Sequence, residues 1–184
     1  MADNKNVGVL VGSLRKDSYA LKLAKALMRL APSSLQMTQI QIGDMPHYNE
    51  DLDTDNPPES WARFRREMGA QDAVLFVSPE YNRSLPSVLK NAIDVGSRPY
   101  GSSIWEGKAG AVATHSPSGI GGALSNHAIR QATVFLGLPL MTQPEMYIGD
   151  SYNVFDKEGN IVKDGSEKFL SDCMATFETW LQRF

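Results

Sequence analysis

Five short apolar segments alternate with segments of helical periodicity along this chain, and this alternation limits the possible folds most strongly. Several apolar segments consist almost wholly of Val, Leu, Ile, Phe and Ala, which is typical of strands buried on both faces of a parallel sheet. Because crossovers between parallel strands are right-handed, the pattern predicts a doubly wound α/β fold with helices on both faces. The expected strands are residues 7–11, 35–42, 73–78, 109–114 and 140–143.

Composition narrows the class of protein. The chain has 184 residues, of which 42% are hydrophobic, so we expect a single domain over residues 1–184. A net charge of −3 argues against nucleic acid or an anionic membrane as a partner, since both attract basic surfaces. Residues 1–6 are polar and the apolar runs are short, so we expect no membrane span and a cytoplasmic protein. One cysteine and three scattered histidines predict no disulfide and no metal site.

The first loop, Gly12–Ser18, joins the first predicted strand to a helix. Backbone N–H groups and the positive end of the helix dipole favour an anion at such a turn, and Ser13, Arg15 and Ser18 add polar groups. The loop has no Gly-Lys-Ser/Thr for a nucleotide triphosphate, no GxGxxG and no cysteine nucleophile. We therefore expect it to hold a phosphate without transferring it.

Two further loops follow the third and fourth predicted strands. In a doubly wound sheet of order 2-1-3-4-5, ligands bind beyond the carboxyl ends of the strands, where the winding reverses. The second loop, residues 79–86, carries Tyr81 as a flat face, although an ordinary strand-to-helix turn is the alternative reading. The third loop, residues 114–122, has glycines that let backbone approach a ligand closely. Together the three loops suit a flavin whose phosphate lies in the first loop.

The segments Gly12–Ser18, Pro79–Asn82 and Leu89–Asp94 resemble the NAD(P)H-dependent FMN reductase family, and within it the bacterial quinone and chromate reductases. The resemblance covers nearly the whole chain. It implies a flavodoxin-like fold, FMN as cofactor, NADPH or NADH as co-substrate, and a homodimer or homotetramer. The residues it implies for cofactor binding are Ser13, Leu14, Arg15, Ser18, Tyr19, Ala20, Pro79, Glu80, Tyr81, Asn82, Ser116 and Gly119, with Tyr48 and Arg83 at the substrate rim.

The function implied is an FMN-dependent NAD(P)H:acceptor oxidoreductase. Hydride would pass from NAD(P)H to flavin N5, and two electrons would then pass to a small acceptor such as a quinone, chromate or an azo compound, by a ping-pong mechanism. Because the flavin carries the chemistry, we expect no catalytic side chain. A flavodoxin-like FMN electron carrier that does not itself oxidise NAD(P)H is the main alternative. A phosphosugar- or nucleotide-binding regulator is the third.

Three other features call for an interpretation. His115 ends the fourth predicted strand, and we interpret it as a buried, hydrogen-bonded histidine, with contact to the flavin as the alternative. Residues 124–136 have apolar side chains almost all round a predicted helix, and burial against a second subunit would explain them. Residues 154–155 and 161–162 are expected to pair in a hairpin rather than to form a calcium loop.

Overall fold

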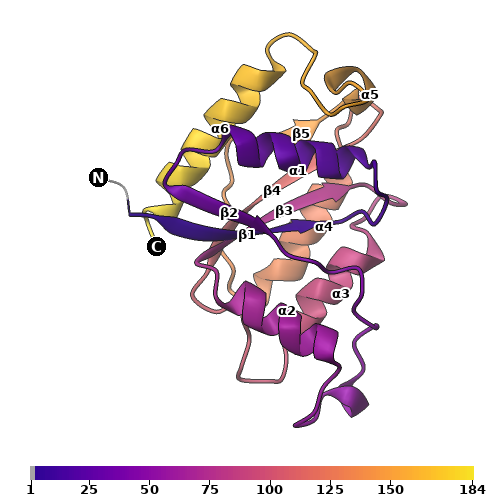
Figure 1. Cartoon of the computed structure of the whole chain (residues 1–184), viewed down its shortest axis with the longest axis vertical. Helices are drawn as coiled ribbons and strands as arrows, with labels where there is room; N and C mark the ends of the chain where they lie inside the picture. The colour runs from indigo at the N-terminus through magenta and orange to yellow at the C-terminus, as the bar shows by residue number, and fades with distance from the viewer. Residues whose placement is uncertain (1–2) are drawn as a thin grey trace.

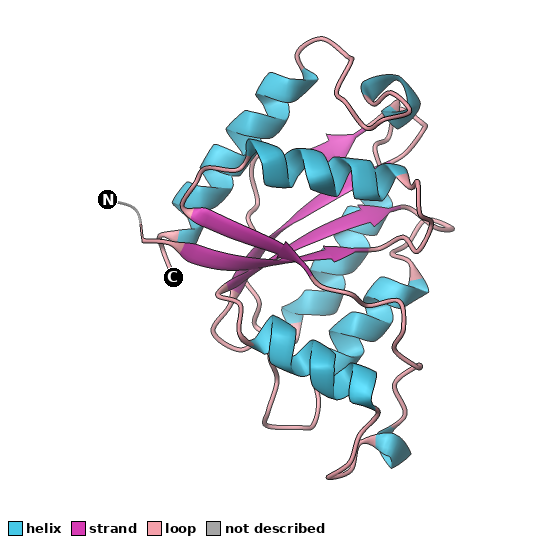
Figure 2. Ribbon diagram, in the orientation of Figure 1, coloured by secondary structure: helices cyan, strands magenta, loops and turns pink. Residues whose placement is uncertain are grey.

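The structure, a computed structural model, describes residues 3–184, so Met1 and Ala2 of the polar N-terminal stretch lie outside the described residues. All strands run parallel in one sheet of order β2-β1-β3-β4-β5, with their arrowheads pointing to one side of the molecule in Figure 2. This confirms the predicted fold class and strand order. The strands are β1 Lys5–Val11, β2 Leu35–Gln39, β3 Ala73–Pro79, β4 Ala109–His115 and β5 Met146–Ile148.

Helices cover both faces of the sheet, as Figure 1 shows. One face is covered by α1 (Tyr19–Leu30) and α6 (Ser166–Leu181). The other face is covered by α2 (Glu59–Gly69), α3 (Ser87–Gly96) and α4 (Ala123–Val134). Two short helices, η1 (Glu50–Leu52) and α5 (Ser151–Val154), lie in the connections between larger elements.

Alternate strand residues supply the two hydrophobic cores, because successive side chains of a strand point to opposite faces. Val9 and Val11 of β1 are buried against α1 and α6, whereas Leu10 lies among the aromatic side chains of the opposite core. On β4 the residues facing α1 and α6 are small alanines, and His115 follows them on the same face. The side chain of His115 therefore points toward the α1 side of the sheet.

The fifth strand is the one predicted element that the structure places elsewhere. We expected residues 140–143, but Leu140 makes only an isolated bridge with Gly110, and the strand is Met146–Ile148. Pro144 has no N–H to give to a ladder, so pairing with β4 breaks off and resumes after it. The second strand ends at Gln39, three residues earlier than expected. The hairpin is confirmed by the bridge between Phe155 and Ile161.

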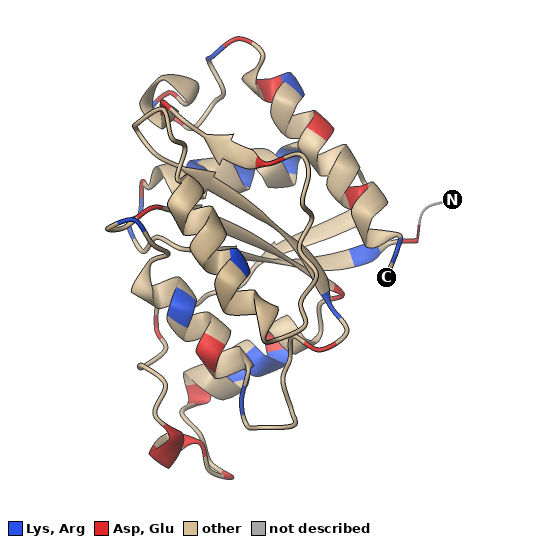
Figure 3. Ribbon diagram, turned by 180° about the vertical axis from the view of Figure 1, so that it is seen from behind, with Lys and Arg blue, Asp and Glu red and all other residues tan. Residues whose placement is uncertain are grey.

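The topology brings the three loops together. Strands β1, β3 and β4 are neighbours in the sheet, so the loops that follow their carboxyl ends also lie next to one another. Pro79 and His115 are direct register partners at the ends of β3 and β4. Within residues 3–184 no helix is both long and apolar enough to cross a bilayer. Figure 3 shows basic and acidic residues interspersed along the helices rather than gathered on one basic face.

Candidate functional site

A cleft of about 150 Å³ lies at the carboxyl ends of β1, β3 and β4, with α5 along one side. Residues from all three predicted loops meet in this cleft, as we expected if the loops bind one common ligand. Eight of the residues predicted to bind the cofactor line this cleft: Ser13, Arg15, Ser18, Tyr19, Pro79, Glu80, Tyr81 and Ser116. Three more residues line it: His115, for which contact with the flavin was the alternative interpretation, and Pro117 and Tyr152, which the sequence did not single out.

The first loop presents backbone donors and one free guanidinium. Ser18 is buried and caps α1, since its Oγ accepts the N–H of Leu21 at 3.1 Å. Among residues 3–184, the backbone N–H groups of Ser13 and Leu14 find no acceptor, and Arg15 takes part in no ion pair. The first turn of α1 also has no acidic residue to oppose an anion. These features suit a phosphate group at the helix N-terminus.

The second loop is shaped by a tight turn. Tyr81 and Ser84 exchange two backbone hydrogen bonds of 3.0 and 2.9 Å. The two residues between them, Asn82 and Arg83, have φ values of 49° and 63°, the left-handed conformations that a two-residue hairpin turn of this kind needs. The turn leaves the Tyr81 side chain at the rim, where the residue is 47% exposed. A flat aromatic face is thereby available to a ring at the mouth of the cleft.

Glu80 connects the second loop to α4. Its Oε2 accepts the N–H of Leu124 at 3.0 Å and that of Ser125 at 3.4 Å, and its Oε1 accepts Nη1 of Arg83 at 3.0 Å. The N-cap residue of α4, Gly122, has no side chain to satisfy those helix donors, so Glu80 does so from another loop. The carboxylate that we expected beside the cofactor thus fixes the distance between the second and third loops.

The third loop turns sharply before α4. Gly122 has φ of 78°, and a Cβ there would lie 2.9 Å from the carbonyl oxygen of His115, so a glycine is required on both counts. Ser116 Oγ accepts the N–H of Ser118 at 3.1 Å and lies at the cleft. Gly119 borders a neighbouring pocket formed with α6 instead.

The remaining predicted residues lie outside the cleft. Ala20 is fully buried in the core under α1. Leu14 lines an adjoining cavity of about 450 Å³ between the first loop and the end of β2, which Ser13 and Arg15 also border. Tyr48 stacks on Trp61, with ring centroids 5.4 Å apart, and its N–H is held by Asn91 Oδ1 at 2.8 Å. Asn82 and Arg83 are the two central residues of the turn in the second loop and do not line the cleft.

His115 is the most buried polar residue of the cleft wall after Ser18. It is 7% exposed, and its Nδ1 lies 3.2 Å from Ser151 Oγ of α5. Within the described chain, its Nε2 has no hydrogen-bond partner. Burial lowers the pKa of His115 from 6.5 to about 4, so the imidazole is neutral at physiological pH.

This burial predicts an acid-dependent loss of stability. Between pH 6.5 and about 4 the unfolded chain binds a proton at His115 that the folded chain does not, so stability must fall as the pH falls. We expect the wild-type protein to lose about 2–3 kcal/mol more unfolding free energy across this window than His115→Gln. Urea denaturation at a series of pH values measures this difference. Parallel pH profiles for the two proteins would contradict the assignment.

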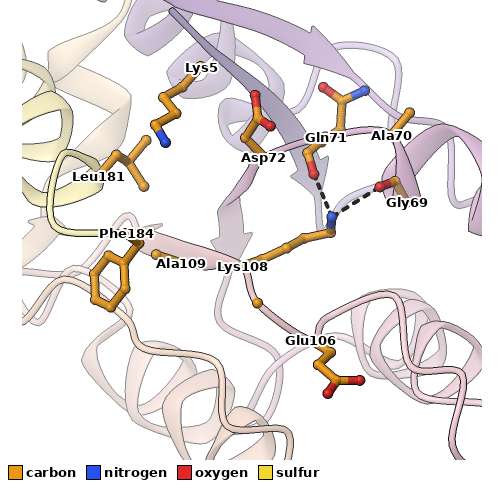
Figure 4. A pocket seen from close by; sticks show the side chains of 11 residues that line it. Lys5, Gly69, Ala70, Gln71, Asp72, Glu106, Lys108, Ala109, Leu181 and Phe184 are labelled. Atoms are coloured by element: carbon orange, nitrogen blue, oxygen red, sulfur yellow. Dashed lines mark hydrogen bonds between the residues drawn. The ribbon is translucent and has the colours of Figure 1, made fainter. Parts of the chain in front are cut away.

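A second polar pocket, of about 320 Å³, lies at the amino ends of the strands (Figure 4). In it Lys108 Nζ donates to Gly69 O at 3.1 Å and to Gln71 O, so it satisfies carbonyls at the end of α2. Burial lowers the pKa of Lys108. This pocket is on the opposite edge of the sheet from the three loops, and its buried lysine is already used by the fold.

The polar groups and the aromatic ring that line the cleft suit the parts of FMN. It combines an N–H cradle with Arg15 for a phosphate, an exposed aromatic ring at the rim, and a buried imidazole nitrogen without a partner among residues 3–184. Ligand pockets typically measure roughly 300–1,000 Å³. A bound flavin would therefore extend past the cleft along the exposed loops that border it.

Comparison with known proteins agrees with this chemistry. Residues 6–153 match the family model of NADPH-dependent FMN reductases. A quinone reductase of Pseudomonas putida is 53% identical over 182 residues, which cover 99% of this chain and 97% of that protein. A 2-hydroxy-1,4-benzoquinone reductase of Burkholderia sp. is 43% identical over 176 residues, covering 96% of each.

Solved structures give the same picture. The flavoenzyme NAD(P)H:(acceptor) oxidoreductase FerB from Paracoccus denitrificans superposes with a TM-score of 0.90 at 42% identity, covering 97% of this chain and 98% of that one. A flavodoxin from Pseudomonas aeruginosa, 18% identical with a TM-score of 0.61, shares the fold. The chain belongs to the NADPH-dependent FMN reductase family and is an oxidoreductase that uses FMN and NAD(P)H.

Proposed function

We propose that the chain, as a single flavodoxin-like FMN-binding domain, is a cytoplasmic NAD(P)H:acceptor oxidoreductase that reduces quinones by two electrons. The observation that carries the proposal is the convergence of three loops on one cleft, with a phosphate cradle at one end and Tyr81 at the rim. Bound FMN supplies the chemistry by accepting a hydride from the nicotinamide and passing two electrons to the acceptor. The names of the relatives in Pseudomonas putida and Burkholderia support quinones as the acceptor class.

The residues of the chain bind and orient in this proposal. Arg15 and the N–H groups of the first loop hold the phosphate, and Glu80 holds the second and third loops at a fixed separation. Tyr81 presents its ring where the nicotinamide and the acceptor enter in turn. The side chain of Arg83, which is 63% exposed, places a positive charge at the same rim. No proton transfer is assigned to a side chain.

Steady-state kinetics test this function. With NADH or NADPH as donor and a benzoquinone as acceptor, we expect parallel double-reciprocal lines, because donor and acceptor use one site in turn. Chromate and an azo dye are included as further acceptors, and we expect both to be reduced by the same mechanism. Intersecting lines would show that donor and acceptor bind together and would contradict the one-site mechanism. A protein that holds FMN but oxidises neither nucleotide would be a carrier.

Replacing Tyr81 with alanine should disturb turnover more than folding. Loss of an aromatic contact of about 0.5–1.5 kcal/mol should raise KM for the nicotinamide nucleotide roughly two- to tenfold. Because the side chain is half exposed, the unfolding free energy should change by less than about 0.5 kcal/mol. Tyr81→Phe keeps the ring and is the matched control. A large drop in melting temperature with normal kinetics would instead show that Tyr81 is a structural residue.

We also propose that the chain self-associates, as a homodimer or homotetramer, through α4. Leu124 and Phe135 are eleven residues apart and share one helical face, and they are 41% and 83% exposed. Phe135→Ser should therefore shift the sedimentation of the protein toward the monomer. Tyr100→Ser, which removes an 88% exposed aromatic residue elsewhere, is the control. A monomeric wild-type protein would contradict the proposal.

A further inference from the structure

One buried polar atom of the cleft wall has no role in the fold. Within residues 3–184, three buried side-chain polar atoms lack a hydrogen-bond partner, and of these His115 Nε2 alone belongs to a residue that lines the cleft. A buried polar group without a hydrogen-bond partner lowers the stability of the folded state by about 1–3 kcal/mol, and no contact of Nε2 within the described residues offsets this loss. A ligand that supplies the missing hydrogen bond would recover it.

The position of His115 indicates which part of the cofactor it meets. It is the register partner of Pro79, where the second loop begins. Its ring centroid lies 6.3 Å from that of Tyr19, the first residue of α1, where the first loop ends. His115 thus neighbours both the start of α1, where the loop assigned to the phosphate ends, and the start of the loop assigned to the ring. The ribityl chain is the part of FMN that joins the two.

The contacts of α5 hold the imidazole in place. Ser151 Oγ lies 3.2 Å from Nδ1, and the backbone N–H of Ser151 donates to Ser116 O at 3.2 Å, which ties α5 to the third loop. Tyr152 packs against Tyr19 with the two rings tilted and their centroids 4.7 Å apart, and it lines the same side of the cleft. With Nδ1 occupied by Ser151, Nε2 is the ring nitrogen left for a ligand.

The chemistry of the imidazole also favours the ribityl chain over the phosphate. A serine hydroxyl can donate to Nδ1 or accept from it, so Nε2 can be an acceptor or a donor. Ribityl hydroxyls complement either form, because each can donate and accept, whereas a phosphate only accepts. A neutral imidazole, which burial enforces here, suits an uncharged hydroxyl.

We propose that His115 Nε2 hydrogen-bonds a ribityl hydroxyl of the bound FMN. This inference rests on the FMN-dependent function and adds to it a binding residue at the start of the third loop, His115, which is not among the cofactor-binding residues that the family resemblance implies. His115 acts through affinity and cofactor orientation.

A series of three flavins tests the inference by fluorescence titration of the full-length chain freed of flavin. FMN has ring, ribityl chain and phosphate, riboflavin lacks the phosphate, and lumiflavin lacks the ribityl chain. His115→Leu should lower the affinities for FMN and riboflavin by the same factor of about ten, which is the effect of one lost hydrogen bond. Its affinity for lumiflavin should stay within about twofold of the wild-type value. His115→Gln, which restores a polar group, should recover most of this loss and also serves if the leucine variant folds poorly.

Thr114→Val is the matched control. Thr114 Oγ1 is also buried without a partner in the described structure, but Thr114 is next to His115 on β4 and so points to the other face of the sheet. Removal of the Thr114 hydroxyl should leave the affinities for FMN, riboflavin and lumiflavin unchanged. The ribityl assignment would be overturned if His115→Leu lost affinity for lumiflavin as much as for FMN, lost affinity for FMN alone, or lost no affinity. Each of these results would leave the oxidoreductase function intact. A wild-type protein that binds no FMN would overturn both.

Discussion

Arg15→Ala is expected to weaken FMN binding by roughly ten- to a hundredfold. The guanidinium is exposed beside the N–H groups of the first loop, and no carboxylate in the described chain pairs with it. A charge-assisted contact to a phosphate contributes about 1.5–3 kcal/mol, which gives this range of affinity. Fluorescence titration of the flavin-free protein measures the change.

Two controls accompany Arg15→Ala. The first tests whether loss of any nearby positive charge weakens FMN binding, and the second tests whether Arg15 contacts the phosphate rather than the rest of the cofactor. Lys16→Ala removes a neighbouring exposed cation that does not line the cleft, and it should change FMN affinity by less than about threefold. Riboflavin, which has no phosphate, should bind Arg15→Ala as it binds the wild type. Equal loss of riboflavin and FMN affinity would place Arg15 away from the phosphate, and unchanged FMN affinity would remove it from the site.

Glu80→Ala is expected to lower the unfolding free energy by about 2–3 kcal/mol and the melting temperature by roughly 4–12 °C. The substitution leaves the N–H groups of Leu124 and Ser125 at the start of α4 without their acceptor. It also releases Arg83 in the left-handed turn. Because the second and third loops are then no longer joined, FMN affinity should fall together with stability.

Two variants separate the contacts of Glu80. Glu80→Gln keeps an acceptor for α4 without the charge and should lose about half as much stability. Arg83→Ala removes only the exposed ion pair, which contributes about 0–1 kcal/mol, and should leave the melting temperature nearly unchanged. If Arg83→Ala destabilises the protein as much as Glu80→Ala does, the contact with α4 is not what stabilises the loops.

The sequence carried enough information for the fold because its signals are local. Residues 73–78 and 109–114 are continuous apolar runs, and each is followed by a loop rich in turn formers, so strand, loop and helix could be placed in order. The first loop was recognisable because a phosphate cradle is a contiguous piece of chain. Eight predicted binding residues consequently meet in one cleft.

The remaining features depend on contacts between distant segments. Leu140 belongs to an apolar run that looks like a strand, but the strand is Met146–Ile148, because pairing with β4 resumes only beyond Pro144. The family resemblance implies only a place beside the cofactor for Glu80, and its contact with the N–H groups of α4 becomes visible only in the folded chain. Tyr152 was missed because α5 is four residues long and has no periodic signal, although its place after β5 puts it beside the third loop.

Anaerobic addition of NADH or NADPH to the purified protein tests the central claim most directly. The claim is that the three-loop cleft binds FMN and that the chain itself oxidises NAD(P)H. We predict a yellow protein whose visible flavin absorption is rapidly lost with at least one nucleotide and returns when a quinone is added. A yellow protein that neither nucleotide bleaches, or a colourless protein that takes up no FMN, would contradict the account.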